Sequence, residues 1–586
     1  GADFFYDAEG NLTKVTDKVN GIFYYTYDAL NRLLTAQQPL GQIVGYSYDP
    51  VGLRKRLSYP DNTFLNYTYD SSDRLTSIKE GSGEEYKFVY DIASRRTTLN
   101  YPNGIQTSYT FDEADRLTQI LTKRLSTGEV ISQMNYTVNI LDSRTQTTLQ
   151  YPEKKVFNLY LNDELDRLVD VINKPTLFQH YNYDAVGNRT SAFENGVTKN
   201  YVSNVLNQYT QVDGVPLTYD ANGNLISDGT LTMSYDAENR LVKTVKGTTI
   251  VNYQYDWSNR LMKKTVNGGA PIYFIYDGVH VIGEAASSRG LTRRYILGDS
   301  IDFLLSQVQG RDKYYFTRDG VNSTRDVLDR TGNVIQRMEY DAFGKVTVQN
   351  KNGNPVADLP KTNYLYTGRE LITEVDLYNF RNRFYSNKLG RFLSEDRLGF
   401  FGGSVNLYEF NANSPLNFDD PTGLSSVFIT IGGKEIPFDK AGFERGNQLI
   451  LYCGNTPDFS KYLPLLLLLH PGPDSDNGSL YRRSYNRNQG RPITPEFVRR
   501  MLAYTMLGGN SPDFSKFLPF LSSLPPGFGN GSSRNIRTTP GTPLTRESLN
   551  RMNSYILLGG NSPNFGNFLP FLMSITSNTS NPLRKR

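Results

Sequence analysis

The sequence predicts a mainly β protein built of stacked β-hairpins, followed by a small α-helical repeat region. An aromatic residue followed by Asp recurs six times at a spacing of 21 residues, which indicates one structural unit repeated along the chain. The 586-residue chain also contains 41 Tyr against a single Trp, and Tyr suits a half-buried pleated surface. Its 50 Gly, with frequent Asn and Asp, are typical of short strands joined by turns. The six aromatic-Asp pairs begin at Tyr6, Tyr27, Tyr48, Tyr69, Tyr90 and Phe111.

Each repeat unit has the pattern of one β-hairpin. In the segment 67–70, Tyr-Thr-Tyr-Asp, both rings fall on one face of a strand because side chains alternate. The following Asp-x-x-x-Arg is a tight turn, and Arg-Leu-Thr begins the returning strand. A hairpin cannot bury its own face, so neighbouring units must cover it. We therefore assign the Tyr and Asp residues to sheet packing and turn capping, not to binding or catalysis. Beyond Phe111 the spacing loosens, but hairpins remain recognisable at Tyr183, Tyr219, Tyr235 and Tyr255.

The units resemble the YD or Rhs repeats of bacterial Rhs proteins, the Tc-toxin B and C components and the teneurins. The resemblance covers about residues 1–424 and implies a β-sheet ribbon that spirals into a hollow cocoon. It implies three domains, which are a repeat shell at 1–377, a plug at 378–424 and a variable C-terminal cargo at 425–586. Fewer than about 20 hairpins are present, so the chain could also be one half of a container that needs a partner chain.

The end of the repeat region carries a second, more specific pattern. From Leu377 the sequence looks like the terminal block of the Rhs core. Its closing Pro-x-x-x-x-Asp-Pro-x-Gly-Leu is complete and includes Pro415, Pro421 and Gly423. After Leu424 the composition changes and the hairpin pattern stops.

Two aspartates in this block are candidates for catalysis. Two carboxyl groups in one site of low dielectric constant share a proton, so one can act as base on a water molecule and the other as acid. Asp396 and Asp420 lie 24 residues apart, on either side of the turn at 402–403, and chain reversal there could bring them together. The residues alone favour ordinary turn aspartates. The family resemblance instead implies an aspartic self-cleavage dyad that cuts the bond between Leu424 and Ser425.

The resemblance also assigns secondary roles around the dyad. Arg391 matches a recurrent position beside the first aspartate, so we expect it to support a carboxylate. Glu395 and Asp419 are less favoured because they fall beside the motif positions. Arg397 follows Asp396 where the family usually has Pro, so Arg397 could pair with the dyad, lower its pKa and slow cleavage.

Other catalytic chemistry finds little support in the sequence. The three histidines and the single cysteine are too far apart for metal-ligand spacing, so we expect no metal and no cofactor. Cys453 and His470 could form a nucleophile and base, but a packing cysteine is the favoured interpretation. One cysteine also excludes an internal disulfide framework, and no phosphate-binding loop occurs. The histidines are His180, His280 and His470.

The C-terminal region consists of three copies of another unit. The copies at 454–464, 509–519 and 560–570 begin with Gly-Asn and end with Leu-Pro, and each is predicted to be a helix, a glycine turn and a short helix. The 162 residues after Leu424 carry 18 Lys and Arg and 9 Asp and Glu, a net charge of +9, which leaves −5 for the rest of a chain whose total is +4. A cluster of arginines could contact phosphate or anionic lipid, although a solvated linker is favoured. The cluster comprises Arg482, Arg483, Arg487 and Arg491.

The family resemblance leads to a function. It implies a secreted or cell-surface toxin shell that encloses its own C-terminal segment as cargo and releases it by self-cleavage. The alternative is a non-enzymatic YD-repeat adhesion shell with an uncleaved binding tail. Expected partners are the cargo itself, an N-terminal shell or secretion-apparatus component and a target-cell surface. No signal peptide or membrane-spanning segment is visible and the chain begins within a repeat, so we expect a fragment of a longer protein.

Overall fold

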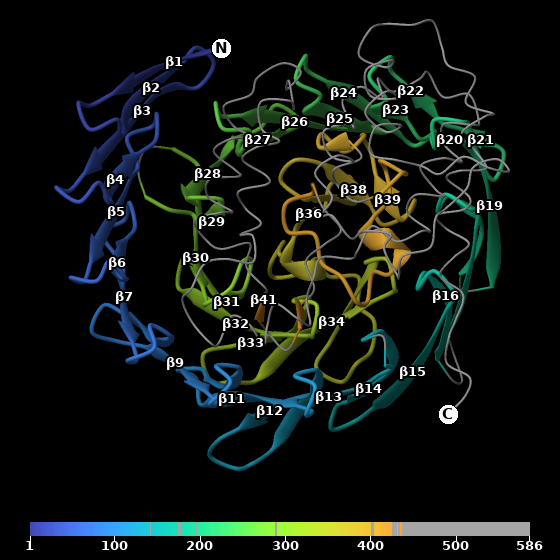
Figure 1. Ribbon diagram of the computed structural model, residues 1–586, viewed down its shortest axis with the longest axis horizontal. Helices are drawn as coiled ribbons and strands as arrows, with labels where there is room; N and C mark the ends of the chain where they lie inside the picture. The colour runs from blue at the N-terminus through green and yellow to red at the C-terminus, as the bar shows by residue number, and fades with distance from the viewer. Residues whose placement is uncertain are drawn as a thin grey trace, which may run out of the picture. The chain divides into compact units, whose positions relative to one another are not determined.

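The computed structural model is a nearly all-β protein, which confirms the predicted fold class (Figure 1). The chain divides into two units, Gly1–Pro457 and Asp458–Arg586, and all described residues belong to the first. The predicted helical repeats after Leu424 lie outside the described residues. The helices among the described residues are 3-10 turns of three residues, η1 (Tyr366–Gly368) and η3 (Asn411–Asn413), and neither is long enough to cross a membrane. The structure describes residues 1–140, 142–173, 177–194, 196–287, 290–399 and 404–424, and the strands β40 (Thr430–Ile431) and β41 (Lys434–Glu435).

The first sheet has 21 strands and follows the order of the chain. Every strand from β1 to β20 pairs antiparallel with the next strand in sequence, as expected for joined hairpins. Its strands are β1 (Ala2–Tyr6), β2 (Leu12–Asp17), β3 (Gly21–Tyr27), β4 (Leu33–Gln37), β5 (Ile43–Tyr48), β6 (Arg54–Ser58), β7 (Phe64–Tyr69), β8 (Leu75–Glu80), β9 (Glu85–Tyr90), β10 (Arg96–Asn100), β11 (Ile105–Phe111), β12 (Leu117–Arg124), β13 (Val130–Val138), β14 (Arg144–Gln150), β15 (Lys155–Asn162), β16 (Leu168–Asn173), β17 (Leu177–Tyr183), β18 (Arg189–Glu194), β19 (Val197–Ser203), β20 (Tyr209–Val212) and β21 (Val215–Pro216).

The second sheet has 14 strands with the same sequential antiparallel pairing. Its strands are β22 (Thr218–Tyr219), β23 (Leu225–Ser227), β24 (Leu231–Tyr235), β25 (Leu241–Lys246), β26 (Thr249–Tyr255), β27 (Leu261–Val266), β28 (Ile272–Asp277), β29 (His280–Ala285), β30 (Arg293–Leu297), β31 (Leu304–Gln309), β32 (Asp312–Arg318), β33 (Thr324–Leu328), β34 (Val334–Tyr340) and β35 (Val346–Gln349).

A small third sheet follows, with strands β36 (Glu370–Ile372), β37 (Leu377–Asn379), β38 (Phe384–Ser386) and β39 (Arg391–Phe392). It starts ahead of residue 378, where the plug was predicted to begin. We refer to residues 370–424 as the plug block below. The division into shell, plug and cargo stays a prediction.

The repeat motif is explained by contacts within and between hairpins. In one unit Asp70 caps its own turn, because its Oδ1 accepts the N–H of Arg74 at 3.1 Å while its Oδ2 accepts from the Arg74 side chain at 2.7 Å. The Arg74 guanidinium lies 5.1 Å from the ring centre of Tyr90 in the next hairpin and donates to the Asp91 carbonyl at 3.0 Å. The sheet register shifts at Tyr69, so a bulge recurs where the motif turns the strand. The same Asp–Arg pair forms at Asp28–Arg32, Asp91–Arg95, Asp112–Arg116, Asp163–Arg167, Asp236–Arg240 and Asp256–Arg260.

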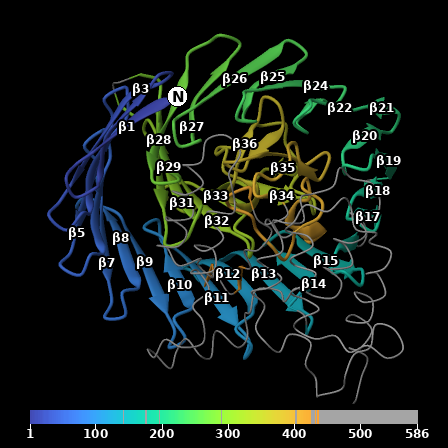
Figure 2. The ribbon, with the colours of Figure 1, turned by 45° about the horizontal axis from the view of Figure 1, so that its top comes forward.

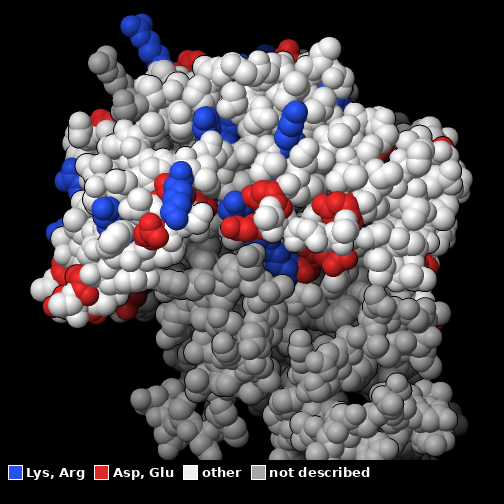
Figure 3. All heavy atoms as spheres, turned by 90° about the horizontal axis from the view of Figure 1, so that it is seen from above, with Lys and Arg blue, Asp and Glu red and all other residues white. Residues whose placement is uncertain are grey.

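The two large sheets pack face to face. Apolar side chains from β5 to β15 share one core with side chains from β28 to β33. Tyr59 and Tyr101 donate from the first sheet to carbonyls of Tyr295 and Phe316 in the second, each at 2.8 Å. Figures 1 and 2 show the first sheet curving around, with the later strands on its inner side. A second core joins β15–β28, which include strands of both large sheets, to the plug block. On the face in Figure 3, acidic and basic side chains are intermixed.

Candidate active site

The predicted dyad comes together around an arginine that the sequence analysis did not single out. The Arg383 Nη2 atom lies 2.9 Å from Asp396 Oδ2 and 3.6 Å from Asp420 Oδ2. The side chains of Asp396, Asp420 and Arg383 are 8%, 1% and 3% exposed. Two buried carboxyl groups therefore share one guanidinium, and chain reversal between residues 396 and 420 brings them to one place.

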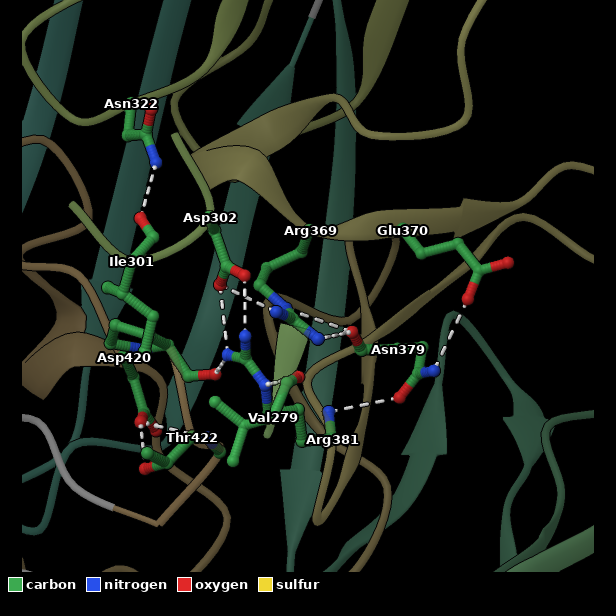
Figure 4. A network of polar contacts seen from close by, with 12 residues as sticks. Val279, Ile301, Asp302, Asn322, Arg369, Glu370, Asn379, Arg381, Asp420 and Thr422 are labelled. Carbon is green, nitrogen blue, oxygen red and sulfur yellow. Dashed lines mark hydrogen bonds and ion pairs between the residues drawn. The ribbon is translucent and has the colours of Figure 1, made fainter. Parts of the chain in front are cut away.

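The Asp420 side chain lies against the backbone that leads to the predicted cleavage point. Its Oδ1 atom accepts the N–H groups of Gly423 at 2.8 Å and Leu424 at 3.2 Å. The Thr422 hydroxyl donates to the same oxygen at 3.1 Å, as Figure 4 shows. These donors stabilise the carboxylate form of Asp420. Ser425, on the far side of the predicted bond, lies outside the described residues.

Asp396 is electrostatically different from its partner. The pKa of Asp396 is raised to about 6, because burial and, less strongly, the charge of Asp420 outweigh the opposing effects of Arg383 and the Leu398 N–H. That N–H donates to Asp396 Oδ1 at 2.8 Å. A carboxyl group with this pKa is partly protonated near neutral pH, so Asp396 can serve as a proton donor.

The turn between β37 and β38 holds the backbone ahead of Leu424. Arg381 donates to the Pro421 carbonyl, Asn382 Nδ2 donates to the Thr422 carbonyl at 3.1 Å, and Arg383 Nε donates to the Gly423 carbonyl. We call residues 381–383 the clamp. Three successive carbonyls are thus fixed by three successive side chains, and Arg383 connects the clamp to both carboxylates.

Gly423 is required by this geometry. Its φ of +69° is in the left-handed region, and a Cβ atom built there would lie 2.5 Å from the Phe380 carbonyl oxygen. The glycine of the closing motif therefore allows close approach of the backbone to the clamp.

A buried network of ion pairs holds the clamp residue Arg381 in place (Figure 4). Asp302 pairs with Arg369 at 2.6 Å and with Arg381 at 2.5 Å. The two guanidinium groups hold the pKa of Asp302 well below its usual range despite burial. Arg369 also donates to the Asn379 carbonyl at 2.7 Å, so the network fixes the start of the β37–β38 turn as well as Arg381 within it.

Arg391 lies away from the dyad carboxylates. Its guanidinium donates to the Asn207 carbonyl at 2.7 Å and to the Asn188 side chain at 2.8 Å, and it stacks 3.6 Å from the ring centre of Tyr209. These contacts dock the plug block onto the hairpins of the first sheet. Its predicted support of a carboxylate stays a prediction, and the cation that contacts both carboxylates is Arg383.

The remaining motif residues are also placed. The Arg397 side chain donates to the Glu238 carbonyl, and the ion pairs of the described residues put Arg383 beside the dyad. The expected pairing of Arg397 with the dyad is therefore not what the structure shows. Asp419 is buried, and the Pro415 carbonyl oxygen lies 3.4 Å from the Tyr366 hydroxyl, which donates to the Ala342 carbonyl at 3.0 Å.

In the part of the chain that the structure describes, no three His, Cys, Asp or Glu side chains lie close enough together to hold a metal ion. His180 contacts Asp170 at 2.7 Å, and burial lowers the pKa of His280 to about 4. Cys453 and His470 lie outside the described residues.

Together these features define a class of protein, a curved antiparallel β-shell of hairpin repeats joined to a packed terminal block. The teneurin YD-shell family model matches residues 124–416, half of the chain, and the RHS repeat model matches residues 6–43 and 69–106. The chain belongs to the Rhs/YD-repeat family.

Parts of the chain are similar in sequence to known bacterial proteins. The tRNA3(Ser)-specific nuclease WapA of Bacillus spizizenii is 33% identical over 273 residues, which cover 44% of this chain and 11% of that protein. Toxin protein Tse5 of Pseudomonas aeruginosa is 28% identical over 271 residues, 39% of this chain and 20% of that protein. The matched part is thus at most a fifth of these relatives' length.

The fold has a counterpart among solved structures. The crystal structure of TcdB2-TccC3-TEV superposes with a TM-score of 0.61 at 17% identity and covers 72% of this chain and 25% of that one. At this identity the likeness concerns the fold alone.

Proposed function

We propose that residues 1–424 are part of the shell of an exported Rhs-type toxin and that the plug block frees the segment starting at Ser425 by aspartic self-cleavage. The shared fold and the toxin names of the relatives support the shell. The observation that carries the cleavage proposal is the convergence of Asp396 and Asp420 on Arg383, beside the backbone of Leu424.

The chemistry follows from the unequal carboxyl groups. Asp420, which accepts three hydrogen bonds, acts as the base and takes a proton from a water molecule. The water oxygen attacks the carbonyl carbon of Leu424 while protonated Asp396 donates its proton, at first to the carbonyl oxygen. The tetrahedral intermediate then loses its C–N bond, and the Ser425 nitrogen leaves as an amine after accepting a proton from the dyad. The products are a carboxylate on Leu424 and an amine on Ser425.

Arg383 contributes in two ways. Its contacts with both carboxylates hold them together without repulsion, and its Nε donates to the carbonyl of Gly423, one residue from the bond. A fixed guanidinium in a buried site costs no reorganisation during the reaction. Because Arg383 also favours the ionised form of Asp396, it limits the protonated fraction available at neutral pH.

Self-cleavage should be visible on a denaturing gel. The wild-type chain is expected to give two fragments, and mass spectrometry should place the new ends at Leu424 and Ser425. Asp396→Asn and Asp420→Asn each remove one member of the dyad while keeping its shape, so the expected loss of rate is at least about 1,000-fold.

The matched control is Asp419→Asn, which alters the carboxyl group next to the dyad and should leave the fragment pattern unchanged. An intact wild-type band, or cleavage that persists in both dyad variants, would remove the protease proposal. Cutting at the bond between Gly423 and Leu424 instead would retain the dyad but change the assignment of the bond.

The rate of self-cleavage should fall as pH rises above about 6. The proton donor Asp396 has a pKa of about 6, so the protonated fraction decreases about tenfold for each pH unit well above that value. Stability should change at lower pH. The folded chain binds this proton more tightly than the unfolded chain, so Asp396 costs stability as pH rises from about 4 to about 6. Fragment formation measured from about pH 5 to pH 8 and melting temperature measured from about pH 3 to pH 7 test the two effects, and a rate that rises with pH would contradict the assigned roles.

A second candidate is a non-enzymatic YD-repeat shell with a tail that is never released. The contact of Arg383 with both carboxylates favours it, because a guanidinium can hold both groups ionised and prevent proton sharing. The same gel separates the two functions. The proposal has three further parts. The shell encloses the cargo, and a partner shell chain or secretion component associates with it. The basic tail contacts a target-cell surface, a membrane or nucleic acid.

A further inference from the structure

A groove opens where the first large sheet ends and the second begins. It lies between β20–β21 and β22–β23, the strands labelled at the upper right of Figure 1, and has about 960 Å³ of empty space including solvent at its mouth. Its lining combines apolar walls with two carboxyl groups and contains no Lys, Arg or His. The residues used below are Leu206, Gln208, Leu217, Tyr219, Asp220 and Glu395.

Among the residues that the structure describes, no Lys, Arg or His side chain forms an ion pair with the Glu395 carboxyl group. The Tyr408 hydroxyl lies 3.3 Å from Glu395 Oε1 but only 2.7 Å from the Gly223 carbonyl oxygen. A hydroxyl has one proton, and the shorter contact takes it. Burial raises the pKa of Glu395, and the Tyr408 hydroxyl opposes this shift. A half-buried carboxylate without a charged partner favours a cation that can reach it.

The other carboxyl group in the lining, Asp220, is already bonded within its own turn. Its Oδ1 accepts the N–H groups of Asn222 and Asn224, each at 2.9 Å, and its Oδ2 accepts from the Asn224 side chain. Asp220 therefore adds negative potential without needing a new donor. Gln208 is also satisfied, because it donates to Tyr408 at 3.2 Å. Glu395 is thus the group with capacity left for a ligand.

The walls suit the stem of a long cationic side chain. Leu217 is buried and Leu206 is 44% exposed at the mouth, so together they offer an apolar strip. Tyr219 adds an aromatic ring to the same lining. Lysine and arginine bury their methylene stems along apolar surface and place the charged head against carboxylates and aromatic faces.

We propose that this groove is a docking site for a lysine or arginine side chain of a partner protein, with Glu395 as the group that binds the charge. The site is independent of self-cleavage, because Glu395 is not needed for the proposed reaction. Charge complementarity selects the partner, since every ionisable side chain in the lining except tyrosine is a carboxylic acid.

The test measures binding of capped pentapeptides to the full chain by titration calorimetry. The peptide acetyl-Gly-Ser-Arg-Ser-Gly-amide and its Lys counterpart should bind, and the norleucine counterpart, which keeps the stem but lacks the charge, should bind at least tenfold more weakly. Glu395→Gln should weaken Arg-peptide binding at least tenfold. Leu206→Ala, an exposed change that leaves the charge intact, should weaken it two- to fivefold.

The matched control is Glu113→Gln, which removes a carboxylate from an exposed hairpin turn outside the groove and should leave binding unchanged. Equal binding of the norleucine peptide, or equal binding to the Glu395→Gln chain with an unchanged circular dichroism spectrum, would overturn the proposal. The proposal would also be overturned if the wild-type chain did not bind the Arg peptide at about 10 mM. This holds whether the groove has no affinity for the peptide or is already filled by cationic side chains of the same chain.

Discussion

Asp302→Asn is expected to destabilise the packing of the plug block by about 3–5 kcal/mol, because it leaves two buried arginines without their shared counter-charge. Asp302 pairs with Arg369 and Arg381, and all three side chains are largely buried. The amide cannot neutralise either guanidinium. The measurement is the melting temperature together with limited proteolysis of the region after residue 370. Because Arg381 is a clamp residue, the same variant should also slow any self-cleavage.

Two comparisons make this expectation specific. Asp142→Asn alters an ion pair with Arg116 that is 58% exposed at the aspartate, so its cost should stay below about 1 kcal/mol. The pKa of Asp302 is held below its usual value, so its contribution is complete above about pH 4 and is lost as pH falls through the folded-state pKa. The difference between wild type and Asp302→Asn should therefore shrink in strong acid. A difference of under 1 kcal/mol at pH 7 would contradict the network's role.

Gly423→Ala is expected to displace the backbone at the predicted cleavage point and to reduce self-cleavage at least about 100-fold. The new Cβ would lie 2.5 Å from the Phe380 carbonyl oxygen, at a φ of +69° that disfavours any side chain. Strain and overpacking together cost about 2–5 kcal/mol locally. The clamp must then release the Gly423 carbonyl, which separates Leu424 from Asp420. The fraction cleaved after expression and the melting temperature are the readouts.

Gly399→Ala provides the matched control near the same site. Gly399 also has a positive φ, +56°, but an added Cβ would meet nothing within 4 Å. Only the conformational strain of about 1–2 kcal/mol should remain, with cleavage nearly unchanged. If both alanine variants behaved alike, close approach to Phe380 would not explain the need for glycine.

Much of the fold could be predicted from the sequence, because the repeat pattern follows from the geometry of a strand and its adjacent turn. The 21-residue spacing identified the strands, and where a turn carries both Asp and Arg, as at Asp70 and Arg74, the two side chains contact one another. The face-to-face packing of the two sheets could not be predicted, since Tyr59 meets the Tyr295 carbonyl 236 residues later and no local pattern encodes that pairing.

The site was predictable in part. The positions of Asp396 and Asp420 follow from the closing motif, and the structure brings both to one guanidinium. The identity of that cation did not follow, because Arg381, Arg383 and Arg391 lie within one short stretch and only tertiary packing decides which side chain turns toward the dyad. Glu395 shows the same limit. It is adjacent to Asp396 in sequence, yet its side chain lines a groove between the two large sheets.

The sequential pairing of strands has a consequence for how the molecule is made. Each hairpin finds its partner in the chain just synthesised, so the ribbon can grow from one end without a long-range search. The inner face of β5–β15, however, is covered only when β28–β33 arrive some 200 residues later. Until then a broad apolar surface faces solvent, and a nascent ribbon interrupted at this stage is an aggregation-prone species. Closing the second layer over the first therefore joins residues some 200 positions apart, a separation that the pairing of neighbouring strands does not require.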